Sequence, residues 1–372
     1  MVATERDRYV DWLRAVSLVV VVLWHWAFTI LRWTPGGPQP TNPLGFFSGL
    51  WIFTWLLQVM PLFFYVGGYA HLVSWQRAQA RGTSLARYIA GHIRPLLVPA
   101  LGLVGTWALL GTVLGSVYRL SWARNAVMLV ISPLWFLGVY VVLIALLPVT
   151  LWLHRKLDVL ALVLLGGIAM IVDVLRFRFG FIELGWINMA VVWMLAHQAG
   201  FFYRRLVDAP RRLDLSLLFA GLFALVGLVF SGLYPGSMVG VPGDRLSNMA
   251  PPTFVIVALL TFQAGFAEVV RPPFERWLGR PRPARFTAVM NRYALPLFLF
   301  HTTGMAIARA ADYFVFRGRI VDDRPPDLVW WAERPIAVLV PLLFTVPLIF
   351  LFSHHRAAKT RRPIDDASLA GH

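Results

Sequence analysis

The sequence RYVDWLRAVSLVVVVLWHW occupies residues 8–26 and becomes almost wholly apolar after Arg14. A helix needs about 20 apolar residues to cross the hydrocarbon core of a bilayer, and the apolar stretch 12–31 is long enough. It differs from a secretory signal because two tryptophans and a histidine lie in its second half and no small-residue cleavage site follows. We therefore predict a membrane-spanning helix that stays in the protein.

Apolar stretches of similar length recur along the whole chain. Hydrophobic residues make up 58% of the 372 residues and charged residues 14%, whereas a soluble domain has roughly 25% charged residues. Together with the first stretch, ten candidate spans lie at 12–31, 48–72, 91–115, 130–150, 157–174, 182–203, 214–234, 252–270, 292–311 and 330–352. We predict an all-α integral membrane protein with about ten transmembrane helices. Residues 1–352 are expected to form one membrane domain, and residues 353–372 a polar, disordered tail.

The distribution of Lys and Arg predicts the orientation of the chain. Twenty of the 34 basic residues lie in segments on the side of the two termini, nine lie on the opposite side, and five lie within or at the ends of spans. Both termini are therefore expected in the cytoplasm, with the protein in the plasma membrane. This topology and attraction to anionic membrane lipids explain the net charge of +16, so we expect no nucleic-acid partner.

Few residue types in this chain can carry chemistry inside a membrane. There is no cysteine, which excludes disulfides, thiolate catalysis and Cys-bound metals. The nine histidines show no paired helical spacing within the spans, and we expect no metal site. Carboxylates occur only at the ends of spans, which disfavours a proton-coupled pump. Histidine is therefore the deep side chain that can accept a proton near neutral pH.

Arg14 and His25 are expected on one face of the first helix, because eleven residues make about three turns and roughly 16 Å of rise. Asp11 precedes Arg14 by three residues and can pair with it, so we count it among the catalytic candidates. A guanidinium at the membrane rim suits a phosphate, and a deeper imidazole suits activation of a hydroxyl. Acyl-CoA, with a phosphate head and a long thin arm, matches this spacing. Each residue also has a structural interpretation, Arg14 as a cytoplasmic anchor and His25 as a helix–helix contact.

The stretch 8–26 resembles the first helix of the acyltransferase family 3 proteins, which are integral membrane O-acyltransferases, typically with ten spans. Their hallmark is an Arg or Lys, ten residues and then a His, and Arg14 and His25 fit it. Further resemblances follow in the same order at MPLFFYVGGY (60–69), SPLWFLGVYVVL (132–143) and YALPLFLFH (293–301). The sequences INMAVVWMLAHQAGFFY (187–203) and SNMAPPTF (247–254) are similar to those of the actinobacterial branch of the family.

The resemblance implies transfer of an acyl group, usually acetyl, from cytoplasmic acyl-CoA to a hydroxyl of a glycan or glycolipid at the outer face. One known role in the actinobacterial branch is acetylation of trehalose monomycolate. The resemblance makes His25 the catalytic histidine and Arg14 its partner on the coenzyme side. The family often has two spaced arginines at the start of the third helix. Arg94 fits one of them, Gly91 stands where the other is expected, and His92 is expected to substitute in part.

Other polar residues are candidates for the same site. His301 lies about ten residues into its span, so it is expected at the depth of His25 as a second catalytic or acceptor-orienting residue. Substrate-contacting candidates in the cavity are His197, Gln198, Asn188 and Trp135. His25 is expected either to act as a general base on the acceptor hydroxyl or to carry the acyl group transiently, and the sequence leaves both mechanisms open.

Two other classes of function fit some of the same features. A transporter or flippase for a lipid-linked sugar would also have about ten spans and a basic inner face. A scaffold without activity is disfavoured by the intact pair of Arg14 and His25. Chemistry separates these alternatives, because only an acyltransferase consumes the thioester of acetyl-CoA.

Overall fold

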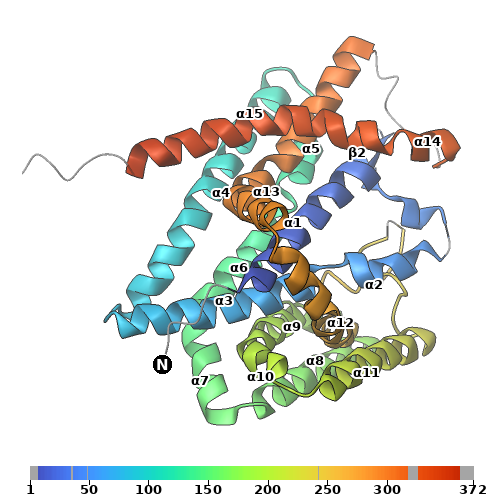
Figure 1. Ribbon diagram of the computed structural model, residues 1–372. Helices are drawn as coiled ribbons and strands as arrows, with labels where there is room; N and C mark the ends of the chain where they lie inside the picture. The colour runs from blue at the N-terminus through green and yellow to red at the C-terminus, as the bar shows by residue number, and fades with distance from the viewer. Residues whose placement is uncertain (1–6, 35–36, 48, 242, 317–325, 361–372) are drawn as a thin grey trace, which may run out of the picture.

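The structure, a computed structural model, describes residues 7–34, 37–47, 49–241, 243–316 and 326–360, and these are mostly helical (Figure 1). The α-helices are α1 (Arg8–Phe28), α2 (Thr54–Leu57), α3 (Met60–Ala80), α4 (Leu85–Ser116), α5 (Ala123–Ile131), α6 (Leu134–Ala145), α7 (Leu147–Leu157), α8 (Leu160–Phe179), α9 (Gly185–Ala199), α10 (Tyr203–Val207), α11 (Arg211–Phe230), α12 (Val255–Leu278), α13 (Pro281–Phe316), α14 (Leu328–Ala332) and α15 (Arg334–Thr360). Short 3₁₀ helices are η1 (Pro43–Gly45), η2 (Leu50–Phe53), η3 (Ile182–Leu184) and η4 (Gly200–Phe202). The strands β1 (Ile30–Thr34) and β2 (Gly37–Thr41) pair antiparallel.

The predicted fold class, a helical multi-pass membrane protein, is confirmed. Among the described residues, seven helical segments are long and apolar enough to cross a membrane, and the pair α5 and α6, bent by 44°, adds an eighth. The seven segments are Arg8–Phe28, Leu50–Ala80, Leu85–Ser116, Leu160–Phe179, Arg211–Phe230, Val255–Leu278 and Arg334–Ser353. In a bilayer, helices satisfy most of their backbone polar groups internally, which is why they can span it.

Two of the ten predicted spans are not among the segments that are long and apolar enough to cross a membrane. The stretch 182–203 is divided between η3, α9 and η4, and α9 has only 15 residues, about 22 Å of helix against a bilayer core of about 30 Å. The stretch 292–311 lies inside the 36-residue helix α13, where His301 and Arg309 lower the local hydropathy. Both stretches are helical, but neither passes as a span by length and composition.

The predicted boundary at residue 352 falls within a helix. Helix α15 continues to Thr360, so the first part of the segment predicted as a disordered tail has a helical backbone. The rest of that segment, residues 361–372, lies outside the described residues. An addition to the predicted all-α fold is the β1–β2 hairpin, which occupies part of the loop predicted between the first two spans.

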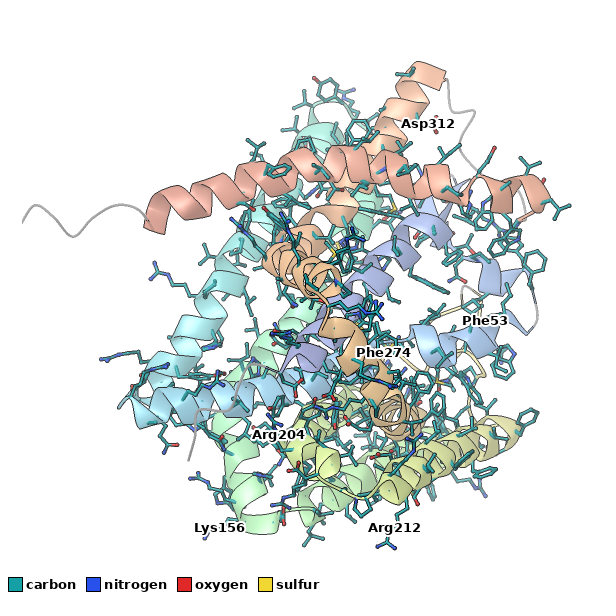
Figure 2. The ribbon with its side chains drawn as sticks, viewed as in Figure 1. Phe53, Lys156, Arg204, Arg212, Phe274 and Asp312 are labelled. Atoms are coloured by element: carbon teal, nitrogen blue, oxygen red, sulfur yellow. The ribbon has the colours of Figure 1, made fainter. Side chains whose placement is uncertain are left out.

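Helix α1 lies among other helices and packs against α3, α12, α13 and α15 (Figure 1). Its first residues lie beside Arg271 near the end of α12, and its last turn lies beside the middle of α13. We refer to these two ends of the helix bundle as the Arg271 end and the His25 end. Figure 2 shows the basic residues Lys156, Arg204 and Arg212 towards one edge of the molecule and Asp312 towards the opposite edge.

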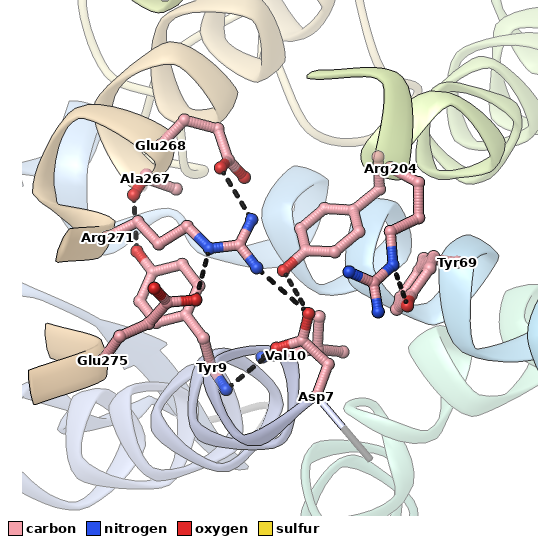
Figure 3. Close-up of polar contacts among 10 residues, drawn as sticks. Asp7, Tyr9, Val10, Tyr69, Arg204, Ala267, Glu268, Arg271 and Glu275 are labelled. Atoms are coloured by element: carbon pink, nitrogen blue, oxygen red, sulfur yellow. Dashed lines mark hydrogen bonds and ion pairs between the residues drawn. The ribbon is translucent and has the colours of Figure 1, made fainter. Parts of the chain in front are cut away.

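A buried ionic cluster fixes the start of α1 (Figure 3). Asp7 caps the helix, because its Oδ1 accepts hydrogen bonds from the backbone N–H groups of Tyr9 and Val10. The other carboxylate oxygen, Oδ2, accepts from Arg271 at 3.1 Å and from the Tyr203 hydroxyl at 2.9 Å. One carboxylate therefore both caps α1 and ties it to α10 and α12.

Arg271 is the centre of this cluster. Besides Asp7, its guanidinium donates to Glu268 at 3.0 Å and to Glu275 at 2.7 Å. The guanidinium also lies over the rings of Tyr9 and Tyr203, at 5.5 Å and 5.0 Å from the ring centroids. The five partners of Arg271 are therefore Asp7, Glu268, Glu275, Tyr9 and Tyr203. They belong to α10, to α12 and to the start of α1, so they set the position of α1 along its axis.

Glycines allow α3 and α9 to cross closely. A Cβ on Gly68 would lie 1.9 Å from the carbonyl oxygen of His197, and a Cβ on Gly200 would lie 1.9 Å from that of Tyr65. Both contacts are with backbone, which cannot rotate away as a side chain can. Small residues at helix crossings are typical of membrane proteins, and here they bring His197 against α3.

We predict that Arg271→Ala destabilises the protein by about 3–5 kcal/mol, because it leaves buried carboxylates without their counter-charge. The free energy of unfolding, measured by denaturant titration in detergent micelles, checks this. Arg205→Ala is the matched control: Arg205 also pairs with a carboxylate, Asp158, but the side chains are 58% and 52% exposed, so about 1 kcal/mol or less is expected. Equal losses in the two variants would contradict the role given to the Arg271 cluster.

Candidate active site

His25, in the last turn of α1, contacts His301 of α13. His25 Nδ1 lies 3.1 Å from His301 Nε2, and the two imidazole rings stack with their centroids 5.0 Å apart. His301 is fully buried, with 0% of its surface exposed. The structure thus brings together two histidines that are 276 residues apart in the sequence.

The hydrogen bonds fix the tautomers of the neutral pair. His301 Nδ1 lies 2.6 Å from the carbonyl oxygen of Phe298, and because a carbonyl only accepts, His301 Nδ1 carries the proton. His301 Nε2 is then an acceptor, so the proton of His25 lies on Nδ1 and points at His301. His25 Nε2 is left with a free lone pair, which is the state that a general base or a nucleophile needs.

Neighbouring residues hold His301 in place. The Trp26 indole N–H donates to the backbone carbonyl of His301 at 2.9 Å, so α1 and α13 are joined directly beside the histidine pair. The next residue, Thr302, donates its hydroxyl to the carbonyl of Val130 at 2.9 Å, which ties α13 to α5. Buried on all sides, the His301 ring has one orientation in which it can accept from His25.

His25 lines a cavity of about 340 Å³ at the His25 end of the bundle. The lining residues are Val21, Trp24, His25, Thr29, Pro40, Thr41, Asn42, Thr54, Leu57, Gln58, Met60, Pro133, Trp135, Phe136, Val239, Gly240, Met249 and Phe298. A volume of this size, mostly apolar with a few polar groups, is typical of a small-molecule site. The last two turns of α1, with Val21, Trp24 and His25, therefore line a cavity, whereas Arg14 does not.

The rim of the cavity is built by the β1–β2 hairpin and the segment that precedes α12. Asn42 donates its side-chain N–H to the carbonyl of Gly240 at 3.2 Å and accepts from the backbone N–H of Leu44, which joins the two parts. Gln58 donates to the carbonyl of Met238 at 3.2 Å. These bonds hold the rim over the last turn of α1.

A second polar cluster lies between the cavity and the Arg271 end. His71 Nδ1 lies 2.9 Å from His197 Nε2, and His71 Nε2 lies 3.2 Å from the Tyr140 hydroxyl. Arg14 interacts electrostatically with both His71 and Tyr140. His92 approaches from α4, with its ring centroid 6.2 Å from that of His71. Sequence reasoning missed His71, although it lies inside the predicted span 48–72.

Aromatic rings separate the second cluster from the cavity. Phe136, which lines the cavity, lies four residues before Tyr140 on α6, with ring centroids 6.3 Å apart. Phe136 also packs on Phe63 of α3 at 5.0 Å and on Phe298 of α13 at 5.3 Å. Phe63, Phe136 and Phe298 thus form an aromatic layer between the cavity and the His71–Tyr140 cluster.

Comparison with known families identifies the chain. The family model described as an acyltransferase domain matches residues 7–354. The chain belongs to the acyltransferase 3 family. Comparisons with curated proteins and with solved structures give no match. The matched range contains both histidines, the cavity and the second polar cluster, so the activity to be explained is acyl transfer.

Among the residues predicted for the acyltransferase site, Trp135 lines the cavity and three others do not. His197 and Gln198 lie at the end of α9, fully buried, where the close crossing with α3 turns His197 towards His71. Asn188 lies near the start of α9 and donates to Asp173 at 3.0 Å and to the carbonyl of Ala169 at 3.2 Å. His197, Gln198 and Asn188 are not among the residues that line the cavity of His25, so their role as substrate contacts stays a prediction.

The catalytic candidate Asp11 and the residues predicted to bind the coenzyme do not all lie in one site. Asp11 lies fourteen residues before His25, about 21 Å along the helix, so it cannot contact that imidazole; its carbonyl accepts from Asn291 at 2.8 Å. Arg14 is half-buried, and its Nε has no hydrogen-bond partner among the described residues. Arg94 is exposed, because residues two apart on a helix face different ways and His92 takes the inward face of α4.

We predict that His301→Ala lowers kcat for acyl transfer by about 10²–10³, because His25 loses the acceptor that fixes its tautomer. His301→Gln is expected to recover part of this loss, since its amide oxygen can accept from His25 Nδ1. Thr287→Val, which changes a buried residue of α13 whose hydroxyl has no hydrogen-bond partner among the described residues, is the control for packing of α13. The measurement is kcat with its pH profile, and equal losses in His301→Gln and His301→Ala would contradict the positioning role.

Proposed function

We propose that this protein is an O-acyltransferase that moves acetyl from cytoplasmic acetyl-CoA to a hydroxyl of a glycan or glycolipid of the cell envelope. The observation that carries the proposal is the His25–His301 pair, whose free His25 Nε2 belongs to a ring lining the cavity. Family membership supports acyl transfer as the reaction class. The sequence resemblance to the actinobacterial branch makes trehalose monomycolate the first acceptor to test.

The proposed step begins with the acceptor hydroxyl in the cavity. His25 Nε2 takes its proton while the oxygen attacks the carbonyl carbon of the thioester. The C–S bond then breaks, and the leaving thiolate takes the proton from the His25 imidazolium, so the products are the acetyl ester and free CoA. Help from a general base typically contributes 10²–10⁴-fold to such a rate. His301 accepts from Nδ1 throughout and keeps the ring in one orientation.

The donor is proposed to approach from the Arg271 end, which we propose as the cytoplasmic side because of its basic residues. Arg14, with an unpartnered buried N–H, suits a phosphate of the coenzyme. The distance of roughly 16 Å from Arg14 to His25 along α1 suits an extended pantetheine arm. That arm has to displace the aromatic layer around Phe136 to bring the thioester to His25.

An acyl-histidine on His25 is the alternative route. It uses the same lone pair on Nε2, with the thioester carbonyl attacked by the imidazole in place of the acceptor. The acceptor hydroxyl then attacks the acetyl-imidazole. The two routes differ in kinetics, because only the second releases CoA before the acceptor binds.

We predict that purified protein consumes the thioester of labelled acetyl-CoA when acceptor lipid is present, and that His25→Ala lowers the rate by 10³-fold or more, on the order of a lost base or nucleophile. The measurement is thiol release together with label in the acceptor. A flippase for a lipid-linked sugar would leave acetyl-CoA intact, and that outcome would overturn the proposal. Release of CoA without acceptor, with label retained on the protein, would identify the acyl-histidine route.

We predict that Arg14→Ala raises KM for acetyl-CoA about 10- to 100-fold, the effect of losing a charge-assisted hydrogen bond. Arg94→Ala is the comparison, and its exposed position gives an expected change of about 3-fold or less. Steady-state kinetics with S-acetylpantetheine, which lacks the nucleotide and its phosphates, completes the test. If Arg14→Ala impairs use of S-acetylpantetheine as strongly as use of acetyl-CoA, Arg14 is not a phosphate ligand.

A further inference from the structure

Most polar side chains that line the cavity are already bonded to the protein. Asn42 bonds to Gly240 and Leu44, and Gln58 bonds to Met238 and Met60. Thr54 donates to the carbonyl of Trp51 and accepts from the N–H of Met238. These groups hold the rim together and have little capacity left for a ligand.

Two threonine hydroxyls in the cavity are not used in bonds to the protein. Thr29 and Thr41 both line the cavity, and within the part of the chain that the structure describes neither hydroxyl has a hydrogen-bond partner. Thr29 is the C-cap of α1, one turn after His25, so the two share a face of the helix. Thr41 pairs with Ile30 in the hairpin, which brings it next to Thr29. The polar side-chain groups of the cavity that have no hydrogen-bond partner among the described residues are therefore these two hydroxyls, His25 Nε2 and the indole N–H groups of Trp24 and Trp135.

The cavity also lacks charge. None of its lining residues, all of which are described, is Asp, Glu, Lys or Arg. A charged group that entered it would lose its hydration without gaining a counter-charge, and isolated charges are costly in such surroundings. Hydroxyls, which donate and accept, suit other hydroxyls.

An aromatic surface completes the site. Trp135 lines the cavity and is 40% exposed, so its indole face is accessible. Its ring also lies 6.2 Å, centroid to centroid, from that of Trp193. A flat aromatic face beside hydroxyls suits a ring that has apolar C–H groups on one face and hydroxyls at its edge.

We infer that the cavity selects an uncharged, polyhydroxylated ring as the acceptor, held by Thr29 and Thr41 against the indole of Trp135, and that it rejects acceptors that carry a carboxylate or a phosphate near the reacting hydroxyl. This inference rests on the proposed function and specifies its acceptor. It assigns Thr29, Thr41 and Trp135 as specificity-determining residues and leaves the chemistry to His25.

The test compares octyl β-glucoside with octyl β-glucuronide, which differ by one carboxylate, as acceptors for labelled acetyl-CoA with the protein in lipid nanodiscs. We expect kcat/KM to be about 100-fold or more higher for the glucoside. Comparable rates with both acceptors would overturn the inference and leave the proposed function standing. If neither acceptor nor trehalose monomycolate is acetylated, the proposed function fails instead.

Variants separate the roles of the three residues. Thr41→Val and Thr29→Val are each expected to lower kcat/KM for the glucoside about 5- to 10-fold through loss of a hydrogen bond, and Thr41→Ser should retain activity. Trp135→Ala is expected to cost about 10- to 100-fold and Trp135→Phe less. Thr112→Val, on the exposed surface of α4, controls for threonine substitution. Normal glucoside kinetics in Thr41→Val and Thr29→Val would overturn the assignment.

Thr41→Lys provides the reciprocal measurement. It places a cation at the cavity rim, so the preference for the glucoside over the glucuronide should fall about 10-fold or more. Thermal unfolding of this variant in nanodiscs near the wild-type temperature shows that it is folded. An unchanged preference in a folded variant would contradict the charge argument.

Discussion

The hydrogen bond from His301 Nδ1 to the carbonyl of Phe298 is the constraint on which the proposed chemistry depends. A carbonyl cannot donate, so this single bond determines which nitrogen of His301 accepts, which nitrogen of His25 donates, and which is left free. The same logic operates in triads in which a carboxylate orients a histidine. Here a neutral imidazole replaces the carboxylate, which avoids placing a negative charge in the membrane.

The bond has this effect only if α1 and α13 are held in register. Trp26 joins them beside the histidines, and Asp7 with Arg271 fixes the opposite end of α1. A shift of α1 by one residue would turn the His25 ring by about 100° and move it by about 1.5 Å. The buried ions at the Arg271 end therefore help to position His25. His25 lies eighteen residues after Asp7, about 27 Å along the helix.

The sequence was sufficient to predict the helical membrane fold and the shared face of Arg14 and His25, because both follow from local periodicity and length. It also predicted similar depths for His25 and His301, since each depth can be counted from the end of a span. The position of His197 was not predictable in this way. It depends on how closely α3 and α9 cross, and hence on Gly68 and Gly200 meeting the opposite backbone. The hairpin that contributes Thr41 was also missed, because its short strands contain two prolines and lack the alternation of a typical strand.

The aromatic layer between the cavity and the His71–Tyr140 cluster bears on a problem that the proposed two-sided reaction raises. A donor on one side and an acceptor on the other would require a passage, but a permanently open, water-filled passage would conduct ions. In the proposed reaction, Phe63, Phe136 and Phe298 would close this passage with apolar rings that a thin arm can push aside and that hydrated ions cannot easily pass. The same rings would keep water from the donor side away from a thioester at His25. The packing of α3, α6 and α13 would then favour acyl transfer over hydrolysis, before any specificity of the acceptor is considered.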